Sequence, residues 1–389
     1  MKQTSGFIST YSADAFGVCS ALFELGGMVV MHDASGCNST YTTHDEPRWY
    51  DMDSMVYISG LTEIEAIMGD DGKLITDITE AAKELEPKFI AIAGTPIPAM
   101  TGFDVDGAAS VIESQTGIPT FGFKTTGMQS YIHGAGAAFL KLAETFVKPE
   151  FKKTEKPSVN ILGLTPLDFS VNGSSSSITE WLKCTGYEIL SSWAMGSTLI
   201  DIEKSGSAHL NYVVSETGLH AAVKLKELFG IPYKTGIPIG GEDIDITGLY
   251  QDVDKNTVLT GFFHDVCDND FSNVLEQADG LVIGEGISAQ SLAKYLSIKT
   301  GKYIAAFKAP DTCEDDIAGI IGSAQNLKLV IADPLFKPLC SGTFSANRPE
   351  LFPLPHEAFS GRLYRKDIPD LIKDTKFLNG LIKEITMKS

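Results

Sequence analysis

The sequence lacks the marks of secreted and membrane-spanning proteins. Its 389 residues hold six scattered cysteines and no CxxC pair, which argues against a disulfide framework and indicates reduced thiols. No run approaches the roughly 18 uncharged apolar residues of a membrane span, because the best candidate, 16–31, contains Glu24 and three glycines. The opening MKQTSGFIST carries no apolar core of a signal peptide. We therefore expect a cytoplasmic protein without a membrane partner.

Positive charge is scarce. The chain has 31 Lys plus Arg against 50 Asp plus Glu, a formal net charge of −19. Such a surface repels phosphate backbones and anionic lipids, so we expect no nucleic-acid partner. The remaining composition, with 43% hydrophobic and 21% charged residues, is typical of a globular protein. The length predicts two or three domains at roughly 150 residues each.

Short apolar runs alternate with helical stretches along the chain, which is the pattern of βαβ units and parallel sheets. Buried strands are expected at 28–31, 54–58, 88–93, 159–164, 210–214, 280–283, 303–307 and 328–331. Helices are expected at 107–115, 134–147, 177–185, 218–229, 288–300 and 315–324, with a terminal helix near 370–387. The pattern predicts an α/β fold whose parallel sheets are flanked by helices.

Two composition breaks divide this series. Residues 148–157 form a charged, proline-bracketed linker, and glycine, proline and acidic residues cluster at 235–245. The breaks predict three Rossmann-like domains. These are an N-terminal α/β domain at 1–155, a middle α/β domain at 156–242, and a third α/β domain at 243–389 that includes a C-terminal returning segment and helix.

Ligands of such sheets collect at the carboxyl ends of the strands. The loop 32–37, His-Asp-Ala-Ser-Gly-Cys, brings an imidazole, a carboxylate and a thiol together there, and Gly36 lets the backbone approach a bulky ligand. This loop is either a metal or cluster site at Cys37 or a strand-end loop with a buried thiol. Likewise, His356 is either a ligand-binding or a structural histidine. The sequence shows no GxGxxG, GxSxG or P-loop lysine that would favour a dinucleotide, hydrolase or phosphate site.

The order of these segments resembles the nitrogenase component 1 family. This family includes the nitrogenase α and β chains, their cofactor-assembly scaffolds and the dark-operative protochlorophyllide reductases. The loop 32–37 resembles the family's H-G-x-x-G-C segment, whose cysteine binds a shared iron–sulfur cluster. Further segments match the family in order along nearly the whole chain: 54–60, 86–94, 158–163, 210–215, 280–286 and, for the returning segment with its cofactor-binding histidine, 355–361.

The resemblance implies a nitrogenase component 1-like fold and an iron–sulfur protein. Cys37 would be a metal ligand of a four-iron, four-sulfur cluster shared between subunits. The partner would then be a homologous or identical subunit in a dimer or tetramer. An ATP-dependent iron protein would supply electrons, and a substrate, a second metallocofactor or a tetrapyrrole would be held between the domains.

Departures from the family pattern fall on its other ligands. Ser12 and Thr95 stand where the family has two more cluster cysteines, and Ser215 stands near its cofactor-anchoring cysteine. With Gly36, these hydroxyl residues are the predicted cofactor-binding positions. Hydroxyls are poorer iron ligands than the thiolates that normally hold such clusters. The resemblance therefore does not extend to the complete nitrogenase cluster set, and dinitrogen reduction is not expected.

Three residues are predicted to serve catalysis in the cavity: His356, His133 and Lys124, with His356 as ligand or proton donor near neutral pH. The leading hypothesis is a nitrogenase-like reductase component that reduces a substrate or cofactor bound between its domains. The alternative is a non-catalytic scaffold or carrier for a metallocofactor or tetrapyrrole. A plain small-molecule binding protein of repeated α/β domains is a third hypothesis.

Overall fold

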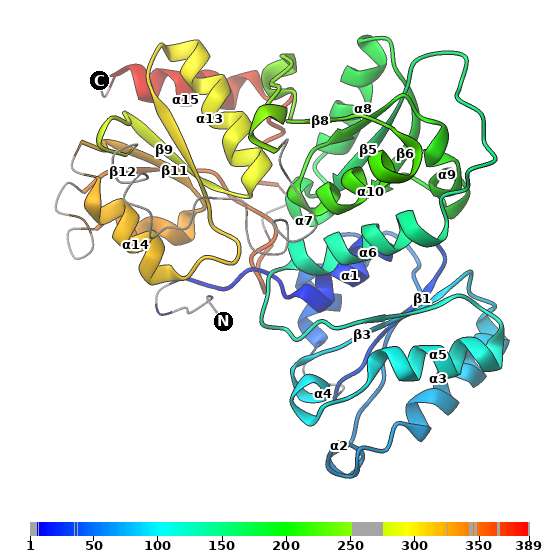
Figure 1. The fold of residues 1–389 in the computed structure, drawn as a ribbon. Helices are drawn as coiled ribbons and strands as arrows, with labels where there is room; N and C mark the ends of the chain where they lie inside the picture. The colour runs from blue at the N-terminus through cyan, green and yellow to red at the C-terminus, as the bar shows by residue number, and fades with distance from the viewer. Residues whose placement is uncertain are drawn as a thin grey trace.

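A computed structural model describes residues 6, 8–34, 36, 38–250, 275–324, 326–341, 345, 348–363 and 366–387. Cys37, the predicted cluster ligand, lies outside these residues. The described chain builds three four-stranded parallel sheets from successive stretches of sequence, here termed the first, middle and third sheets (Figure 1). Helices flank the sheets, so the molecule has the predicted α/β fold. None of the described helices is long and apolar enough to cross a membrane.

The first sheet has the strand order β2-β1-β3-β4 and is covered on both faces. Its strands are β1 (Met28–Met31), β2 (Val56–Ile58), β3 (Ile90–Ala93) and β4 (Thr120–Phe123), and its helices are α1 (Asp14–Leu22), η1 (Tyr41–Asp45), α2 (Glu63–Met68), α3 (Gly72–Leu85), α4 (Pro96–Thr101), α5 (Val105–Thr116) and α6 (Tyr131–Thr145). Met28 and Val30 pack with α3 and α5, whereas Val29 and Met31 pack with α1 and α6. Alternate side chains of a strand point to opposite faces, so a strand covered on both sides is apolar throughout.

The middle and third sheets repeat this plan with the orders β6-β5-β7-β8 and β10-β9-β11-β12. The middle unit contains β5 (Ser158–Leu164), α7 (Pro166–Phe169), α8 (Ser174–Cys184), β6 (Glu188–Ala194), α9 (Leu199–Lys204), η2 (Ser205–Ser207), β7 (Leu210–Val213), η3 (Glu216–Gly218), α10 (Leu219–Phe229) and β8 (Tyr233–Thr235). After η4 (Ile239–Gly241) and η5 (Thr247–Tyr250), the third unit contains β9 (Gly280–Gly284), α13 (Gly286–Thr300), β10 (Ile304–Lys308), α14 (Glu314–Ser323), β11 (Leu329–Ala332), η6 (Pro334–Cys340), β12 (Glu350–Pro353) and α15 (Thr375–Met387).

All eight predicted strands are confirmed within two residues at each end. The seven predicted helices are confirmed with shifts of a few residues, and the last begins at Thr375 rather than near residue 370. Four further strands, β4, β6, β8 and β12, escaped the prediction, and each of them lies at an edge of its sheet. Edge strands are partly exposed, so the polar residues in β6, β8 and β12 break the apolar run that reveals a central strand.

Helix α6 joins the first unit to the middle unit, because α1 packs on one side of it and α10 on the other (Figure 1). The crossing of α1 and α6 depends on two glycines. A Cβ atom on Gly134 would lie 1.7 Å from the Asp14 carbonyl oxygen, and one on Gly17 would lie 2.1 Å from the Tyr131 carbonyl oxygen. Glycine therefore permits a backbone approach that no other residue would allow.

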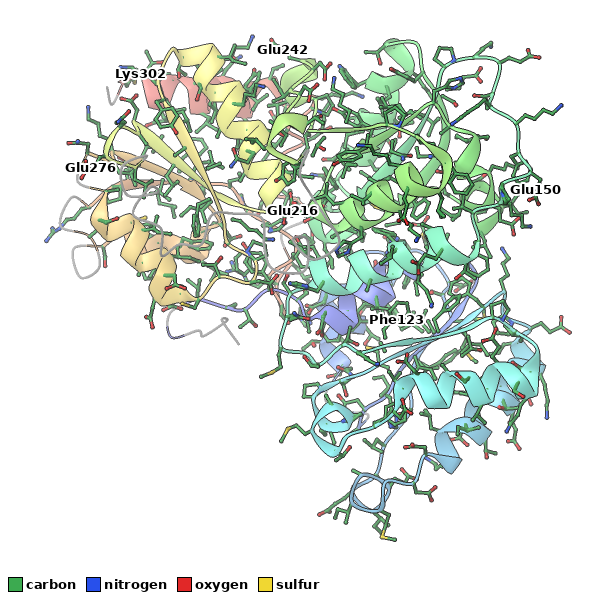
Figure 2. The ribbon with its side chains drawn as sticks, in the orientation of Figure 1. Phe123, Glu150, Glu216, Glu242, Glu276 and Lys302 are labelled. Atoms are coloured by element: carbon green, nitrogen blue, oxygen red, sulfur yellow. The ribbon has the colours of Figure 1, made fainter. Side chains whose placement is uncertain are left out.

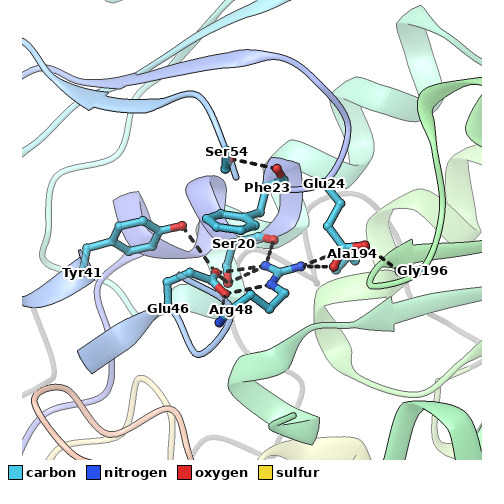
Figure 3. Close-up of polar contacts among 9 residues, drawn as sticks. All are labelled: Ser20, Phe23, Glu24, Tyr41, Glu46, Arg48, Ser54, Ala194 and Gly196. Atoms are coloured by element: carbon cyan, nitrogen blue, oxygen red, sulfur yellow. Dashed lines mark hydrogen bonds and ion pairs between the residues drawn. The ribbon is translucent and has the colours of Figure 1, made fainter. Parts of the chain in front are cut away.

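A buried arginine makes a second joint between these units (Figure 3). The Arg48 side chain is only 4% exposed. Its Nε donates to Glu46 at 2.7 Å, and one terminal nitrogen donates to Glu24 at 2.9 Å and to the Ala194 carbonyl in β6 at 3.0 Å. Glu24 also accepts from the Gly196 amide at 2.7 Å. Because its charge is paired and its donors are used, Arg48 fixes the first unit against the middle sheet.

Candidate functional site

A pocket lies where the carboxyl ends of β5, β9 and β11 come together, between the middle and third sheets. We term it the interdomain pocket, and its empty volume up to the open mouth is about 720 Å³. Its wall is largely apolar and includes Phe169, Ile237, Val282, Ile283, Leu354, Pro355, Ile368, Leu371 and Ile372. Its polar lining residues are Tyr11, Asp168, Ser174, Glu285, Ser288, Asp333 and His356. An apolar wall with a few convergent polar groups is typical of a small-molecule site.

Asp168 and His356 face each other in this pocket. His356 Nε2 lies 3.4 Å from Asp168 Oδ1, and the Asp168 side chain is fully buried. The Tyr131 hydroxyl also donates to Asp168, and Thr165 Oγ1 donates to it at 3.0 Å. His356 Nδ1 is buried and has no hydrogen-bond partner among the described residues. Asp168 therefore orients the imidazole, and the second ring nitrogen has bonding capacity to spare.

Glu285 directly follows β9 and caps α13. Its two carboxyl oxygens accept from the amides of Glu216 and Ser288, each at 2.8 Å. Burial, with the negative charges of Asp168 and Glu216 beside it, raises the pKa of Glu285 to about 8. The carboxyl is therefore mostly protonated at pH 7, and it can act as an acid inside the pocket.

Glu216 lies where the three units meet, near the centre of the view in Figure 2. It forms an ion pair with Lys308 at 2.5 Å, and both side chains are nearly inaccessible to solvent. Burial by itself would lower the pKa of Lys308, but the adjacent Glu216 carboxylate outweighs burial and raises that pKa. Lys308 is therefore charged and already paired, so its charge balances Glu216.

His133, a predicted catalytic residue, is not among the residues that line the pocket. His133 Nε2 lies 3.3 Å from Asp311 Oδ2. Asp311 also accepts from the Ser130 amide at 2.7 Å and from the Ser130 hydroxyl at 2.6 Å. Burial favours the neutral acid, but these contacts dominate and lower the pKa of Asp311. The group joins the start of α6 to the loop after β10.

Lys124 and Ser215 do not line the pocket either. Lys124 follows β4 in the first sheet, is 76% exposed and forms an ion pair with Asp106 at 2.6 Å. It therefore stands apart from His356, and we do not place it in the cavity. Ser215 is fully buried after β7, and its hydroxyl accepts from the amide and hydroxyl of Thr217 at 3.2 and 3.0 Å. These bonds make Ser215 a cap of η3.

The predicted cofactor-binding residues Ser12, Thr95 and Gly36 do not converge on one described site. The main chain of Ser12 bonds to Ala358 and Tyr131, so it joins the N-terminal segment to the returning segment. The Thr95 hydroxyl donates to the His32 carbonyl at 2.7 Å. Gly36 is exposed, with no atom within 4 Å of an added Cβ.

The described cysteines do not supply a set of cluster ligands. Cys19 is fully buried in the core, and burial raises the pKa of its thiol. Cys184 is exposed, Cys313 caps α14 by accepting from the Asp316 amide, and Cys340 is buried. Across the described ranges, no group of three or more His, Cys, Asp or Glu residues could hold a metal ion. These residues do not fit a four-iron cluster.

Of the seven polar residues that line the pocket, sequence reasoning named only His356; the four missed residues with acidic or phenolic side chains are Tyr11, Asp168, Glu285 and Asp333. A signal was present for two of them, because Glu285 and Asp333 each follow the last residue of a central strand and cap the next helix. An acidic residue at the carboxyl end of a parallel strand is well placed to face a ligand. Asp168 carries a weaker form of this signal, since it lies in the first turn of the helix after the central strand β5. Tyr11 carries none, because only the folded chain brings it to the pocket.

Comparison with known proteins agrees with the fold. The family model described as nitrogenase component 1 type oxidoreductase matches residues 14–248. One subunit of the light-independent protochlorophyllide reductase of Chloroflexus aurantiacus is 27% identical over 43% of this chain and 31% of its own length. The nitrogenase molybdenum-iron protein beta chain of Methanothermobacter thermautotrophicus is 24% identical over 56% of this chain and 53% of its own length.

A cofactor-biosynthesis protein is also similar. The nitrogenase iron-molybdenum cofactor biosynthesis protein NifE of Clostridium pasteurianum is 27% identical over 46% of this chain and 38% of its own length. The matches to these three relatives therefore span about a third to a half of each relative. The solved structure of nitrogenase Cp1 at pH 5 superposes with a TM-score of 0.63, at 14% identity, over 100% of this chain and 90% of that chain. That likeness is one of fold.

Proposed function

This chain belongs to the nitrogenase component 1 type oxidoreductase family, and from that premise we propose that it is the substrate-holding component of a nitrogenase-like reductase. The observation that carries the proposal is the interdomain pocket, which encloses a protonated acid, Glu285, and the pair of Asp168 and His356 within an apolar wall. A reductase site needs these two properties, because reduction consumes protons and side reactions with water must be suppressed.

In this proposal the chain's own residues bind the substrate and deliver protons to it. The Glu285 carboxyl holds a proton at neutral pH because burial disfavours its anion. As the substrate gains electrons, it becomes more basic and takes this proton, and Glu285 is then reprotonated from solvent. Asp168 keeps the His356 ring in place, so the imidazole can serve as a second acid. The electrons come from a separate ATP-dependent iron protein.

We also propose that a homologous or identical subunit binds at the exposed carboxyl edge of the first sheet. Ile64, Ile67 and Met68 on α2 are 73–75% exposed, and Met100 on the neighbouring helix α4 is 88% exposed. Contiguous exposed apolar side chains mark an interaction surface. His32, Asp33 and Ala34 follow β1 at this same edge. Cys37 lies outside the described residues, and an iron–sulfur cluster that used it would need ligands from both chains of such a dimer.

The second candidate function is a non-catalytic scaffold or carrier for a metallocofactor or tetrapyrrole. The absence of converging thiols among the described residues favours it, as does the similarity to a NifE protein. A scaffold needs a pocket of the right shape but no proton donor. The two functions therefore differ in what Glu285 does.

The test is turnover with a matched ATP-dependent iron protein. The chain is purified without oxygen, its iron is measured chemically and by electron paramagnetic resonance, and it is mixed with the iron protein, ATP, reductant and a small-molecule extract. We expect reductant-dependent ATP hydrolysis coupled to the loss of one compound. Glu285→Gln should slow this loss about a hundredfold, as expected for removal of a general acid.

The matched control is Glu180→Gln, which changes an exposed carboxylate that pairs with Lys373 outside the pocket. This variant should turn over like the unaltered chain. ATP hydrolysis that is never coupled to loss of a compound, together with transfer of a bound cofactor to another protein, would establish the scaffold function instead.

A further inference from the structure

We propose that the interdomain pocket receives an organic cation, a protonated amine carried on an apolar body, whose ammonium group lies near Asp333 and Tyr11. This inference rests on the proposed function of the pocket as the substrate site. It specifies the chemical class of the substrate, which neither the family nor the sequence motifs indicate.

The charges around the pocket favour a cationic ligand. Asp168 and Asp333 supply negative charge, whereas the Glu285 carboxyl is mostly protonated at pH 7, and no lining residue within the described chain is Lys or Arg. Lys308, a buried cation at the end of β10, is paired with Glu216. Arg362 comes no closer to Asp333 than 4.0 Å and keeps 28% of its side chain exposed. This ion pair is long, so a cationic ligand nearer to Asp333 would offset more of the cost of burying that carboxylate.

The hydrogen-bonding groups of the pocket also favour a cationic ligand. Both oxygens of Asp333 accept from backbone amides, those of Leu335 at 2.9 Å and His356 at 3.0 Å, and each oxygen can accept once more. His356 Nδ1 has no partner among the described residues. The pocket is thus rich in acceptors. An ammonium group carries three N–H donors and no acceptor, so it complements this set.

Tyr11 is an independent sign that a ligand is expected. The residue is only 7% exposed and lines the pocket, yet its hydroxyl has no hydrogen bond to any part of the chain that the structure describes. Burial, with the negative charges of Asp333 and Asp168, raises the pKa of this hydroxyl, so it keeps its proton at neutral pH. A hydroxyl accepts from an ammonium group and donates to a carboxylate at the same time.

The rest of the wall decides what carries the ammonium group. Ile237, Ile283, Leu354 and Ile372 present aliphatic surface to the pocket. A small hydrated cation would leave this surface exposed to water. A phosphate or carboxylate ligand would be repelled by the acidic residues. An amine with an apolar body satisfies both parts of the wall.

The test compares three probes that share one body: 4-phenylbutylamine, 4-phenylbutanol and 4-phenylbutyrate. Their affinities for the purified full chain at pH 7 are measured by titration calorimetry. We expect the amine to bind at least tenfold more tightly than the alcohol and the carboxylate to show no binding. Asp333→Asn should weaken amine binding about tenfold and leave alcohol binding unchanged, whereas Glu180→Gln should change neither.

The comparison of the three probes on the unaltered chain needs no variant, so it stands even where Asp333→Asn fails to fold. Equal affinities for the three probes, tighter binding of the carboxylate, or no binding of the amine at millimolar concentration would each overturn the inference. None of these results depends on electron transfer. Failure of the proposed reductase would instead appear as ATP hydrolysis without loss of substrate, while amine binding persisted.

Discussion

The carboxyl edge of the first sheet and the interdomain pocket are built from the same strand–loop–helix unit, yet they differ in what their polar groups do. At the first edge, the hydroxyls of Thr95 and Thr125 each donate to a backbone carbonyl at 2.7 Å, and His32 Nδ1 lies 2.9 Å from Ser59 Oγ. These loops satisfy their own hydrogen bonds. In the pocket, acidic residues from separate units point at a shared space, and Tyr11 and His356 keep unused capacity.

The difference shows that a sheet edge becomes a site when other units face it. Burial acts on both regions alike, since it lowers the pKa of His32 to about 4 and raises that of Glu285 to about 8, favouring the neutral form in each case. Glu285 lines the interdomain pocket, whereas His32 is not among the residues that line it. The first edge instead presents apolar side chains outward, which suits a protein partner.

The largest loss of stability is expected from removing Arg48, which joins the first unit to the middle sheet. Arg48→Ala leaves Glu46 and Glu24 buried without their cation. We expect the free energy of unfolding to fall by about 3–5 kcal/mol. The measurement is the urea midpoint. Lys373→Ala, which breaks an exposed ion pair with Glu180, should leave this midpoint nearly unchanged. Equal shifts of the urea midpoint in the two variants would show that Arg48 does not join the two units.

A smaller effect is expected at the helix crossing. Gly134→Ala places a methyl group on the Asp14 carbonyl, so α1 and α6 must separate. We expect a loss of about 3 kcal/mol, as for overpacked cores. Gly319→Ala in α14 is the control, because an added Cβ there meets nothing within 4 Å. It should stabilise the helix by about 0.5–1 kcal/mol. Thermal unfolding of the two variants should therefore shift in opposite directions.

The protonation state of Glu285 can be tested through the pH dependence of the free energy of unfolding. Glu285 has a pKa of about 8 in the folded chain, against about 4.3 when unfolded. Between these values the folded chain holds a proton that the unfolded chain releases. The contribution of Glu285 is therefore fully present below the lower pKa and is lost as pH rises toward 8, by at most about 1.4 kcal/mol per pH unit.

The readout is the difference in urea midpoint between pH 5.5 and pH 7.5. Glu285→Gln cannot titrate, so it should remove this component of the slope, while Glu180→Gln should retain it. A slope that is unchanged by Glu285→Gln would show that Glu285 is ionised in the folded chain.

The smallest effect on stability is expected at the first edge. Cys37→Ala should cost about 1 kcal/mol or less, the size of an ordinary small truncation. If Cys37 binds a cluster between subunits, the same change removes the iron and weakens dimerisation, whereas Cys184→Ala and Cys313→Ala leave both intact. Iron analysis and light scattering decide the matter, and equal iron content in all three variants would exclude the ligand role.

The central strands of this fold could be predicted because burial on both faces requires apolar residues at successive positions. Met28–Met31 and Ile90–Ala93 are apolar at every position, and each was expected where it lies. The edge strand Glu188–Ala194 was not expected, because its first residues are exposed and only its last four are buried. Its strand character comes from pairing with β5, which depends on the rest of the sheet.

The sequence by itself determined the α/β class, the strand–loop–helix order and the loops in which ligands collect, because these follow from local periodicity. Only the tertiary structure decided which loops meet. Tyr11, Asp168, Glu285, Asp333 and His356 are spread over 346 positions from Tyr11 to His356, and they form one pocket because the middle and third sheets place their carboxyl ends together beside the N-terminal and returning segments. The tertiary structure also decided the protonation state of Glu285 at pH 7. Glu285 has an ordinary carboxyl chemistry, and burial beside other acids, which is a property of the fold, raises its pKa.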